Sequence, residues 1–265
     1  MKNPIRRNKN IGTSKQGIKK QSIFRLPFDS KKMLDFYEKL GRYKKLEIDL
    51  ENKNILFVVE STKKDFIYTC SIEDIVHILK SVDFKYWEAL EMVVLRQPKK
   101  KEIFISPVWG RLIYSYSFEN QYKKAIILES INCSKKLKWS KKLDIDNQKE
   151  LDRLKRDGHL ILEKKNQYDI QINIDSARNT QLYRTLLHEI GHLYHFAITE
   201  KETYKNFLSS EKENFAYQFS DRMKKELEEK QIIPFKRKLN MEFLQNYKLN
   251  QEDFEVPELN KNLQS

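Results

Sequence analysis

The stretch TLLHEIGHLYHF, residues 185–196, is an apolar segment that contains three of the five histidines of the chain. His188 and His192 are four residues apart, and an α-helix would place their Cβ atoms roughly 5–6 Å apart on one face. Both imidazole rings would then reach a single metal ion. Glu189 follows the first histidine, and its carboxylate would lie beside the ion and accept a proton from a water molecule bound to it. This HExxH arrangement is typical of zinc-dependent peptide hydrolysis.

The residues that flank the motif predict a helix that is buried on most sides. Apolar residues line two of its flanks, whereas a polar stripe contains Gln181, Thr185, His188, His192, His195 and Thr199. Buried polar groups need partners, and a metal-lined cleft would supply them. Gly191 is costly inside a helix, so we expect a neighbouring element to pack closely against it. The alternative interpretation is that these histidines are core or surface residues at a chance spacing.

A zinc site needs a third protein ligand, and the helix expected over about 210–229 offers one. Glu213 shares a face of that helix with the small residues Ala216 and Ser220. Small side chains would let the second helix approach the first. We therefore expect Glu213 to complete the ligand set.

Several side chains near the motif have alternative roles. Glu213 with Ser210 also matches a capping box, which would leave Glu211 or His195 as the third ligand. His195 would otherwise hydrogen-bond near the ion and orient the site. A donor should stabilise the oxyanion of the reaction, and the sequence does not choose between three candidates: Tyr204, Tyr217 and Arg178.

The motif and the segment ENFAYQFS (213–220) together resemble the gluzincin-type ImmA/IrrE family of bacterial metallopeptidase-like proteins. That family shows HExGH, often with another histidine three residues later, and then E-x-x-A-x-x-F-A on the next helix. The resemblance covers roughly residues 175–225 and implies that zinc is held by His188, His192 and Glu213, with Glu189 as general base.

The resemblance also has departures. Ser220 replaces the last alanine of the second motif. Some members of the family cleave repressor-like DNA-binding proteins, but the helix-turn-helix that usually precedes the motif is not evident here. The metzincin continuation is excluded, because it requires glycine at 195 and histidine at 198, where this chain has His195 and Ile198.

The rest of the chain predicts an α+β fold with many strands before the motif. We expect an antiparallel β-meander upstream of the catalytic helix, as in a zincin-like protein, and a cap for that helix at Asn179 or Thr180. A capping box of Ser71 and Asp74 opens a short helix, and Gly110 indicates a bulge or a close backbone approach. The expected helices are 31–45, 71–82, 147–158, 210–229 and 240–247; the expected strands are 54–61 with hairpin partner 66–70, then 91–98, 102–117, 122–131, and the hairpin 159–164 with 168–174.

Three regions follow from this pattern. Residues 1–22 are basic and poor in large apolar residues, which predicts a disordered tail. Residues 23–145 form a strand-rich α+β region, and residues 146–265 contain the zincin-like core with the helices that follow it.

The composition limits the class of protein and its partners. The net charge of +13 permits contact with nucleic acid through the tail, or through the lysines around Trp139 in 135–142, which we otherwise expect to be a solvated loop. Cys70 and Cys133 do not make a disulfide framework, which fits a reducing cytoplasm. No apolar run of about 18 residues is present, so we expect no membrane span.

Two functions of different classes remain. The first is a cytoplasmic zinc metallopeptidase that acts on a protein or peptide, which would pair in extended form with a strand of the 159–174 hairpin. The second is a non-enzymatic, zinc-stabilised nucleic-acid-binding or regulatory protein of a mobile element. Glu189 favours the enzyme, since a structural zinc site needs no general base.

Overall fold

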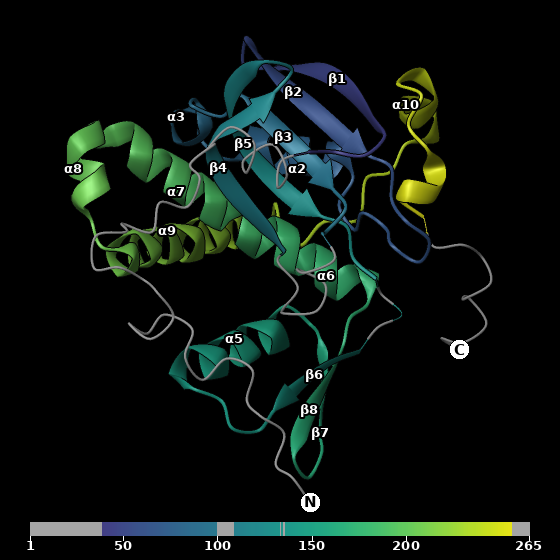
Figure 1. The fold of residues 1–265 in the computed structure, drawn as a ribbon, viewed down its shortest axis with the longest axis vertical. Coiled ribbons are helices and arrows are strands. Elements are labelled where there is room, and N and C mark those ends of the chain that lie inside the picture. Colours follow the sequence, from purple (N-terminus) through teal and green to yellow (C-terminus); the bar gives the residue numbers. More distant parts are fainter. Residues whose placement is uncertain (1–38, 100–108, 133, 135, 256–265) are drawn as a thin grey trace, which may run out of the picture. The chain divides into compact units, whose positions relative to one another are not determined.

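The computed structural model describes residues 39–99, 109–132, 134 and 136–255. These residues form a mixed α+β structure with a five-stranded sheet, a three-stranded sheet and helices that cover them (Figure 1). From Leu40 onward the chain forms one compact unit. The predicted tail, residues 1–22, lies outside the described residues.

The larger sheet has the strand order β1-β2-β3-β5-β4. Its strands are β1 (Tyr43–Leu50), β2 (Lys53–Glu60), β3 (Met92–Arg96), β4 (Gly110–Phe118) and β5 (Gln121–Glu129). β3 pairs in parallel with both β2 and β5, whereas β1 with β2 and β4 with β5 are antiparallel hairpins. All five residues of β3 are buried, as expected of a parallel strand that is covered on both faces.

The prediction of an antiparallel meander is therefore confirmed only for β4 and β5, and it is wrong for β3, which pairs in parallel. The chain leaves β2, crosses through α2 (Ile72–Ser81) and α3 (Phe84–Trp87), and returns as β3 beside β2 in parallel. Such a crossover requires a long connection, whereas a meander requires tight turns.

The partner predicted for β2 is also wrong. β2 pairs with β1 through a two-residue loop of Glu51 and Asn52, both at positive φ, which is the conformation that two-residue hairpins favour. Residues 66–70 contribute only a single bridge, from Ile67 to Ile131. The helix predicted over 31–45 is wrong for all of its described residues, because residues 39–42 are not helical and β1 begins at Tyr43; its residues 31–38 lie outside the described part of the chain.

The helices α2 and α7 (Leu187–Ile198) pack on one face of the larger sheet, and α9 (Ser209–Glu229) packs against α7 (Figure 1). Alternate residues of the strands, such as Phe57, Val93 and Ile126, join the core beneath them. The predicted capping box of α2 is confirmed: Ser71 accepts from the N–H of Asp74, and Asp74 accepts from the N–H of Ser71.

The smaller sheet has the order β6-β8-β7. Its strands are β6 (Lys136–Ser140), β7 (Leu160–Glu163) and β8 (Gln167–Gln171), and helix α5 (Ile145–Arg156) packs on it through Leu151 and Leu154. The predicted helix 147–158 and the predicted hairpin are confirmed. The loop predicted over 135–142 is wrong, because most of it forms β6 and pairs with β8.

The helix that carries the motif begins earlier than predicted. α6 (Ile174–Thr180) starts at a capping box of Asn173 and Ser176, and it continues through a π-helical segment (Gln181–Leu186) into α7. Asn179 and Thr180 are therefore inside a helix and do not cap it. The expected helix 210–229 is confirmed as α9; after α8 (Lys201–Asn206), the chain also contains α10 (Met241–Asn246), near the predicted 240–247. Within the described ranges, no helix is both long and apolar enough to cross a membrane.

Candidate metal centre

His188 and His192 of α7 meet Glu213 of α9. The Nε2 atoms of the two histidines are 3.1 Å apart, and Glu213 places Oε2 at 3.2 Å from His188 and Oε1 at 3.4 Å from His192. The side chains of both histidines are 12% exposed, and that of Glu213 is 50% exposed. The cluster is therefore supported from inside the protein and open to solvent on the side of Glu213.

These separations fit a zinc ion. Zinc binds nitrogen and oxygen ligands at about 2.0–2.2 Å, so two ligands of a tetrahedral site lie roughly 3.3 Å apart. The two imidazole nitrogens are 3.1 Å apart, and each lies 3.2 or 3.4 Å from a different oxygen of Glu213, so both carboxylate oxygens face the position of an ion. Two imidazoles and one carboxylate are also a donor set of hydrolytic zinc sites, in which the fourth position stays open.

The close approach of α9 to α7 brings Glu213 to the histidines. A Cβ atom added to Gly191 would lie 3.0 Å from Cδ1 of Phe219 and 3.1 Å from Cα of Ala216. The expectation that a neighbouring element packs tightly against Gly191 is confirmed. A larger residue at this position would push the two helices apart at the level of the cluster.

The start of α9 distinguishes Glu213 from Glu211. The carboxylate of Glu211 accepts a 2.6 Å hydrogen bond from the N–H of Leu208, so Glu211 caps the helix. The capping box proposed for Ser210 and Glu213 is not formed, because the helix begins at Ser209. Hydrogen bonds from His188 and His192 hold the pKa of Glu213 well below its usual range.

Glu189 lies at the inner side of the cluster and is 9% exposed. Its Oε2 accepts a 2.8 Å hydrogen bond from the backbone N–H of Leu112 in β4. Burial raises the pKa of Glu189, and the nearby His188 and His192 act in the opposite direction. The carboxylate is thus fixed by a strand and held beside the two histidines without belonging to the three-donor cluster.

His195 is separated from the cluster by its packing. Its ring stacks on Phe215, at 4.1 Å between centroids and 16° between planes, and it also contacts Phe207 and Tyr204. Burial lowers the pKa of His195, and its Nδ1 has no hydrogen-bond partner within the described residues. The structure therefore places His195 in an aromatic core, and in the described chain no hydrogen bond joins it to a member of the cluster.

Two of the three candidate oxyanion donors lie near the cluster. The ring of Tyr217 packs 4.5 Å from the ring of His188, and the guanidinium of Arg153 lies 4.0 Å from the centroid of Tyr217. The hydroxyl of Tyr204 is 2.6 Å from the hydroxyl of Tyr114, a residue of β4.

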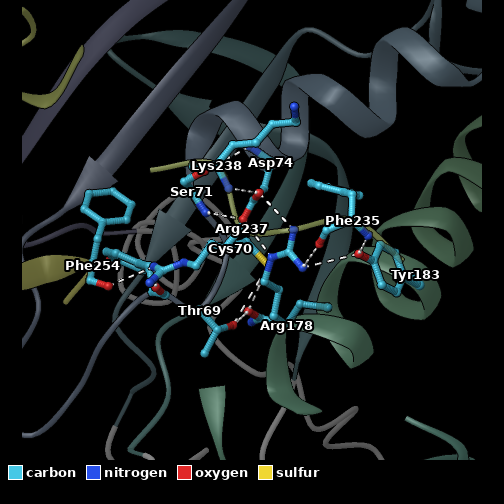
Figure 2. Close-up of polar contacts among 12 residues, drawn as sticks. Thr69, Cys70, Ser71, Asp74, Arg178, Tyr183, Phe235, Arg237, Lys238 and Phe254 are labelled. Carbon is cyan, nitrogen blue, oxygen red and sulfur yellow. Dashed lines mark hydrogen bonds and ion pairs between the residues drawn. The ribbon is translucent and has the colours of Figure 1, made fainter. Parts of the chain in front are cut away.

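Arg178 is not available as an oxyanion donor, because its guanidinium is engaged by Asp74 and Phe235. Its Nε and Nη2 donate to the two carboxylate oxygens of Asp74 at 2.9 and 3.0 Å, and Nη1 donates to the carbonyl of Phe235 (Figure 2). Asp74 also accepts from the backbone N–H of Lys238. Arg178 therefore joins α6 to α2 and to the segment that follows α9.

Three contacts of the site were not predicted from the sequence. They involve Leu112, Tyr114 and Arg153, which come from a strand and a helix distant from the motif. The partly alternating pattern of VWGRLIYSYS indicated a strand but gave no reason to place it against α7. Comparisons with family models, with curated proteins and with solved structures gave no match.

Proposed function

We propose that this protein is a zinc-dependent metallopeptidase with a zincin-like arrangement of its catalytic helices. The single observation that supports it most is the cluster of three donor side chains, with ligand atoms within 4.8 Å of one another, beside the buried carboxylate of Glu189. A structural zinc site has no use for such a carboxylate. Zinc bound by His188, His192 and Glu213 would supply a water of lowered pKa and would polarise the substrate carbonyl.

Glu189 would act as general base and then as general acid. Its Oε2 is engaged by the N–H of Leu112, which leaves Oε1 to accept the proton of the attacking water. The same oxygen would deliver that proton to the leaving amine. Positioned proton transfer of this kind contributes about 10²–10⁴ in rate.

The substrate would bind in extended form along β4. Among the described strands, β4 is an outer strand that pairs with β5 alone, and it contacts Glu189 through Leu112. An extended peptide would add to its open edge by backbone hydrogen bonds. The outer strand β7 of the 159–174 hairpin, proposed from the sequence, makes no such contact with Glu189 in the described structure, so we place the substrate on β4.

The activity would suit a bacterial cytoplasmic protein that cleaves another protein, as the resemblance to the ImmA/IrrE family implies. The alternative, a zinc-stabilised nucleic-acid-binding protein, draws on the overall charge of +13. No arrangement of the described residues favours it over the enzyme.

The test combines metal content with one substitution. Purified protein should contain about one zinc ion per chain and should hydrolyse a denatured, unstructured protein used as a general peptide substrate. Glu189→Gln should keep the zinc and the fold but lose about 10²–10⁴ in rate. Protein without stoichiometric metal, or equal hydrolysis by Glu189→Gln, would refute the proposal. A steeply salt-dependent affinity for DNA without hydrolysis would favour the alternative.

A further inference from the structure

Tyr114 and Tyr204 form a hydroxyl pair that packs against Phe196 of α7, four residues beyond His192. Their oxygens are 2.6 Å apart, and their rings pack against Phe196 at 4.6 and 5.2 Å between centroids. Tyr204 is 5% exposed, with His195 and Phe207 also against its ring, whereas Tyr114 is only partly buried. Tyr204 is thus the inner member of the pair and Tyr114 the outer one.

The two hydroxyls together carry two O–H protons, and the hydrogen bond between them engages one. No other hydrogen bond of either hydroxyl is present among the described residues. If Tyr204 donates to Tyr114, the proton of Tyr114 remains free for an external acceptor, and the bond it receives makes it a better donor.

The position of Tyr114 follows from its strand. Tyr114 lies two residues beyond Leu112 on β4, the strand whose N–H engages Glu189. Burial raises the pKa of Tyr114 well above its usual range; the hydrogen bond with Tyr204 raises it further, and so, more weakly, do the charges of Glu189 and Glu213. The phenol therefore stays protonated at neutral pH, and it lies within the electrostatic reach of both the general base and a metal ligand.

We infer that Tyr114 donates the hydrogen bond that stabilises the oxyanion of the reaction and that Tyr204 positions it. This inference rests on the proposed function. When the attacking water gives its proton to Glu189, its oxygen bonds to the carbonyl carbon, and the π electrons of the C=O bond move onto the carbonyl oxygen. The O–H of Tyr114 would donate to that developing negative charge, and no proton needs to be transferred.

The geometry distinguishes Tyr114 from the other nearby phenol. Tyr217 belongs to the ligand helix α9, and its ring is held between His188 and Arg153. Tyr114 instead belongs to the strand along which we place the peptide. A donor on that strand would have a fixed relation to the backbone of the substrate, because the strand and the peptide share one hydrogen-bonding register.

The experiment compares two small probes on the zinc-loaded protein. Phenylphosphinate has two oxygens, so one can bind zinc while the other takes the place of the oxyanion. Imidazole binds zinc but offers no oxygen. Tyr114→Phe should lower the affinity for phenylphosphinate by about ten- to a hundredfold, as expected when a hydrogen bond to a charged group is lost. It should leave the affinity for imidazole unchanged.

Two further variants complete the comparison, with affinities measured by titration calorimetry. Tyr204→Phe should weaken phenylphosphinate by a smaller factor, since Tyr114 keeps its proton but loses the bond that orients it. Tyr194→Phe is the matched control, because Tyr194 lies on α7 itself and its ring packs 4.8 Å from Tyr86 of α3, not against the hydroxyl pair. It should bind both probes as the wild type does.

Three outcomes would overturn the inference. The first is that Tyr114→Phe binds phenylphosphinate as the wild type does. The second is that Tyr114→Phe loses affinity for both probes equally. The third is that Tyr217→Phe, measured in the same way, is the variant that loses affinity for phenylphosphinate while Tyr114→Phe does not. Failure of the wild-type protein to bind zinc is a different result, since it would refute the proposed function before either probe is added.

Discussion

The backbone N–H of Leu112 and the carboxylate of Glu189 are joined by a 2.8 Å hydrogen bond across 77 residues of sequence. The bond ties the outer strand β4 to the helix that carries the histidines. Among the described residues, Oε2 is the oxygen of Glu189 that accepts a hydrogen bond, which leaves Oε1 for the proposed proton transfer. A strand that would bind the substrate and a base that would act on it are thereby held in one geometry.

This contact predicts the stability of Glu189→Gln. The amide oxygen of glutamine would still accept the N–H of Leu112, but no charge would have to be desolvated at a position that is 9% exposed. We expect metal-free Glu189→Gln to be more stable than metal-free wild type by about 0.5–2 kcal/mol, as is common when a functional charge is removed. Urea unfolding in the presence of a chelator measures the difference. A lower stability would show that the carboxylate supports the fold.

A pair of substitutions on α9 tests the third ligand. Glu213→Gln replaces an anionic oxygen at 3.2 Å from Nε2 of His188, so zinc affinity should fall by more than the roughly 10–100-fold typical of an outer-shell partner. Glu211→Gln makes the same chemical change two positions earlier, where the side chain caps the helix. Competition with a chelator should give Glu211→Gln the affinity of the wild type. Equal losses in both variants would remove Glu213 from the ligand set.

Gly110 provides a test of the contact between β4 and the helix. A Cβ atom at this position would lie 2.6 Å from the carbonyl oxygen of Ile127 and 2.9 Å from Cγ2 of Thr185. The expected close approach at Gly110 is confirmed, and the neighbouring backbone leaves no room for a methyl group. Gly110→Ala should lower the free energy of unfolding by about 1–3 kcal/mol, the usual cost of overpacking. A melting temperature equal to that of the wild type would contradict this.

His159 predicts a pH dependence of stability. Its Nε2 donates to Thr180 at 2.9 Å, because the Thr180 hydroxyl already donates to Asp157. Burial lowers the pKa of His159 to about 4. Between pH 6.5 and 4 the unfolded chain therefore binds a proton that the folded chain does not, and stability falls as the pH is lowered through this window.

The variant His159→Gln isolates this effect. Glutamine can still donate to Thr180 but does not titrate, so between pH 6.5 and 4 the variant should lose about 2–3 kcal/mol less stability than the wild type. Urea unfolding at several pH values, with a chelator present, measures both proteins. Parallel curves for the two would show that the proton on His159 does not contribute.

The approach of His188 and His192 to each other was predictable because their relation is local. A spacing of four residues places His188 and His192 together in any α-helix. The next long helix, α9, carries the small Ala216, which packs against Gly191. The sequence favoured Glu213 over Glu211 but left Glu211 open as an alternative, since the choice depends on where α9 starts. Two residues of difference in that start decide which glutamate caps the helix and which faces the histidines.

The contacts that the sequence could not reveal are non-local. In the sequence, Arg178 is a polar residue close to the motif. Its ion pair with Asp74, 104 positions away, is visible in the structure alone and shows that its guanidinium already has a partner. Leu112 and Tyr114 reach the site because β4 lies at the edge of the sheet. An apolar run such as MVVLR in β3 does not specify parallel or antiparallel pairing, so the predicted meander missed the crossover that sets the strand order.

The central position of β3 has a consequence for the order of folding. β3 lies between two parallel partners, and neither pairing can form through a tight turn. Pairings of residues far apart in the chain slow the search for the native state, since loop entropy is lost before the contacts are gained. Among the described strands, β4 is joined to the larger sheet through β5 alone, so we expect the Leu112–Glu189 contact to form after β5 has joined β3. The histidines and Glu213 lie on α7 and α9, so the metal-binding cluster should form before the strand that fixes Glu189 beside it.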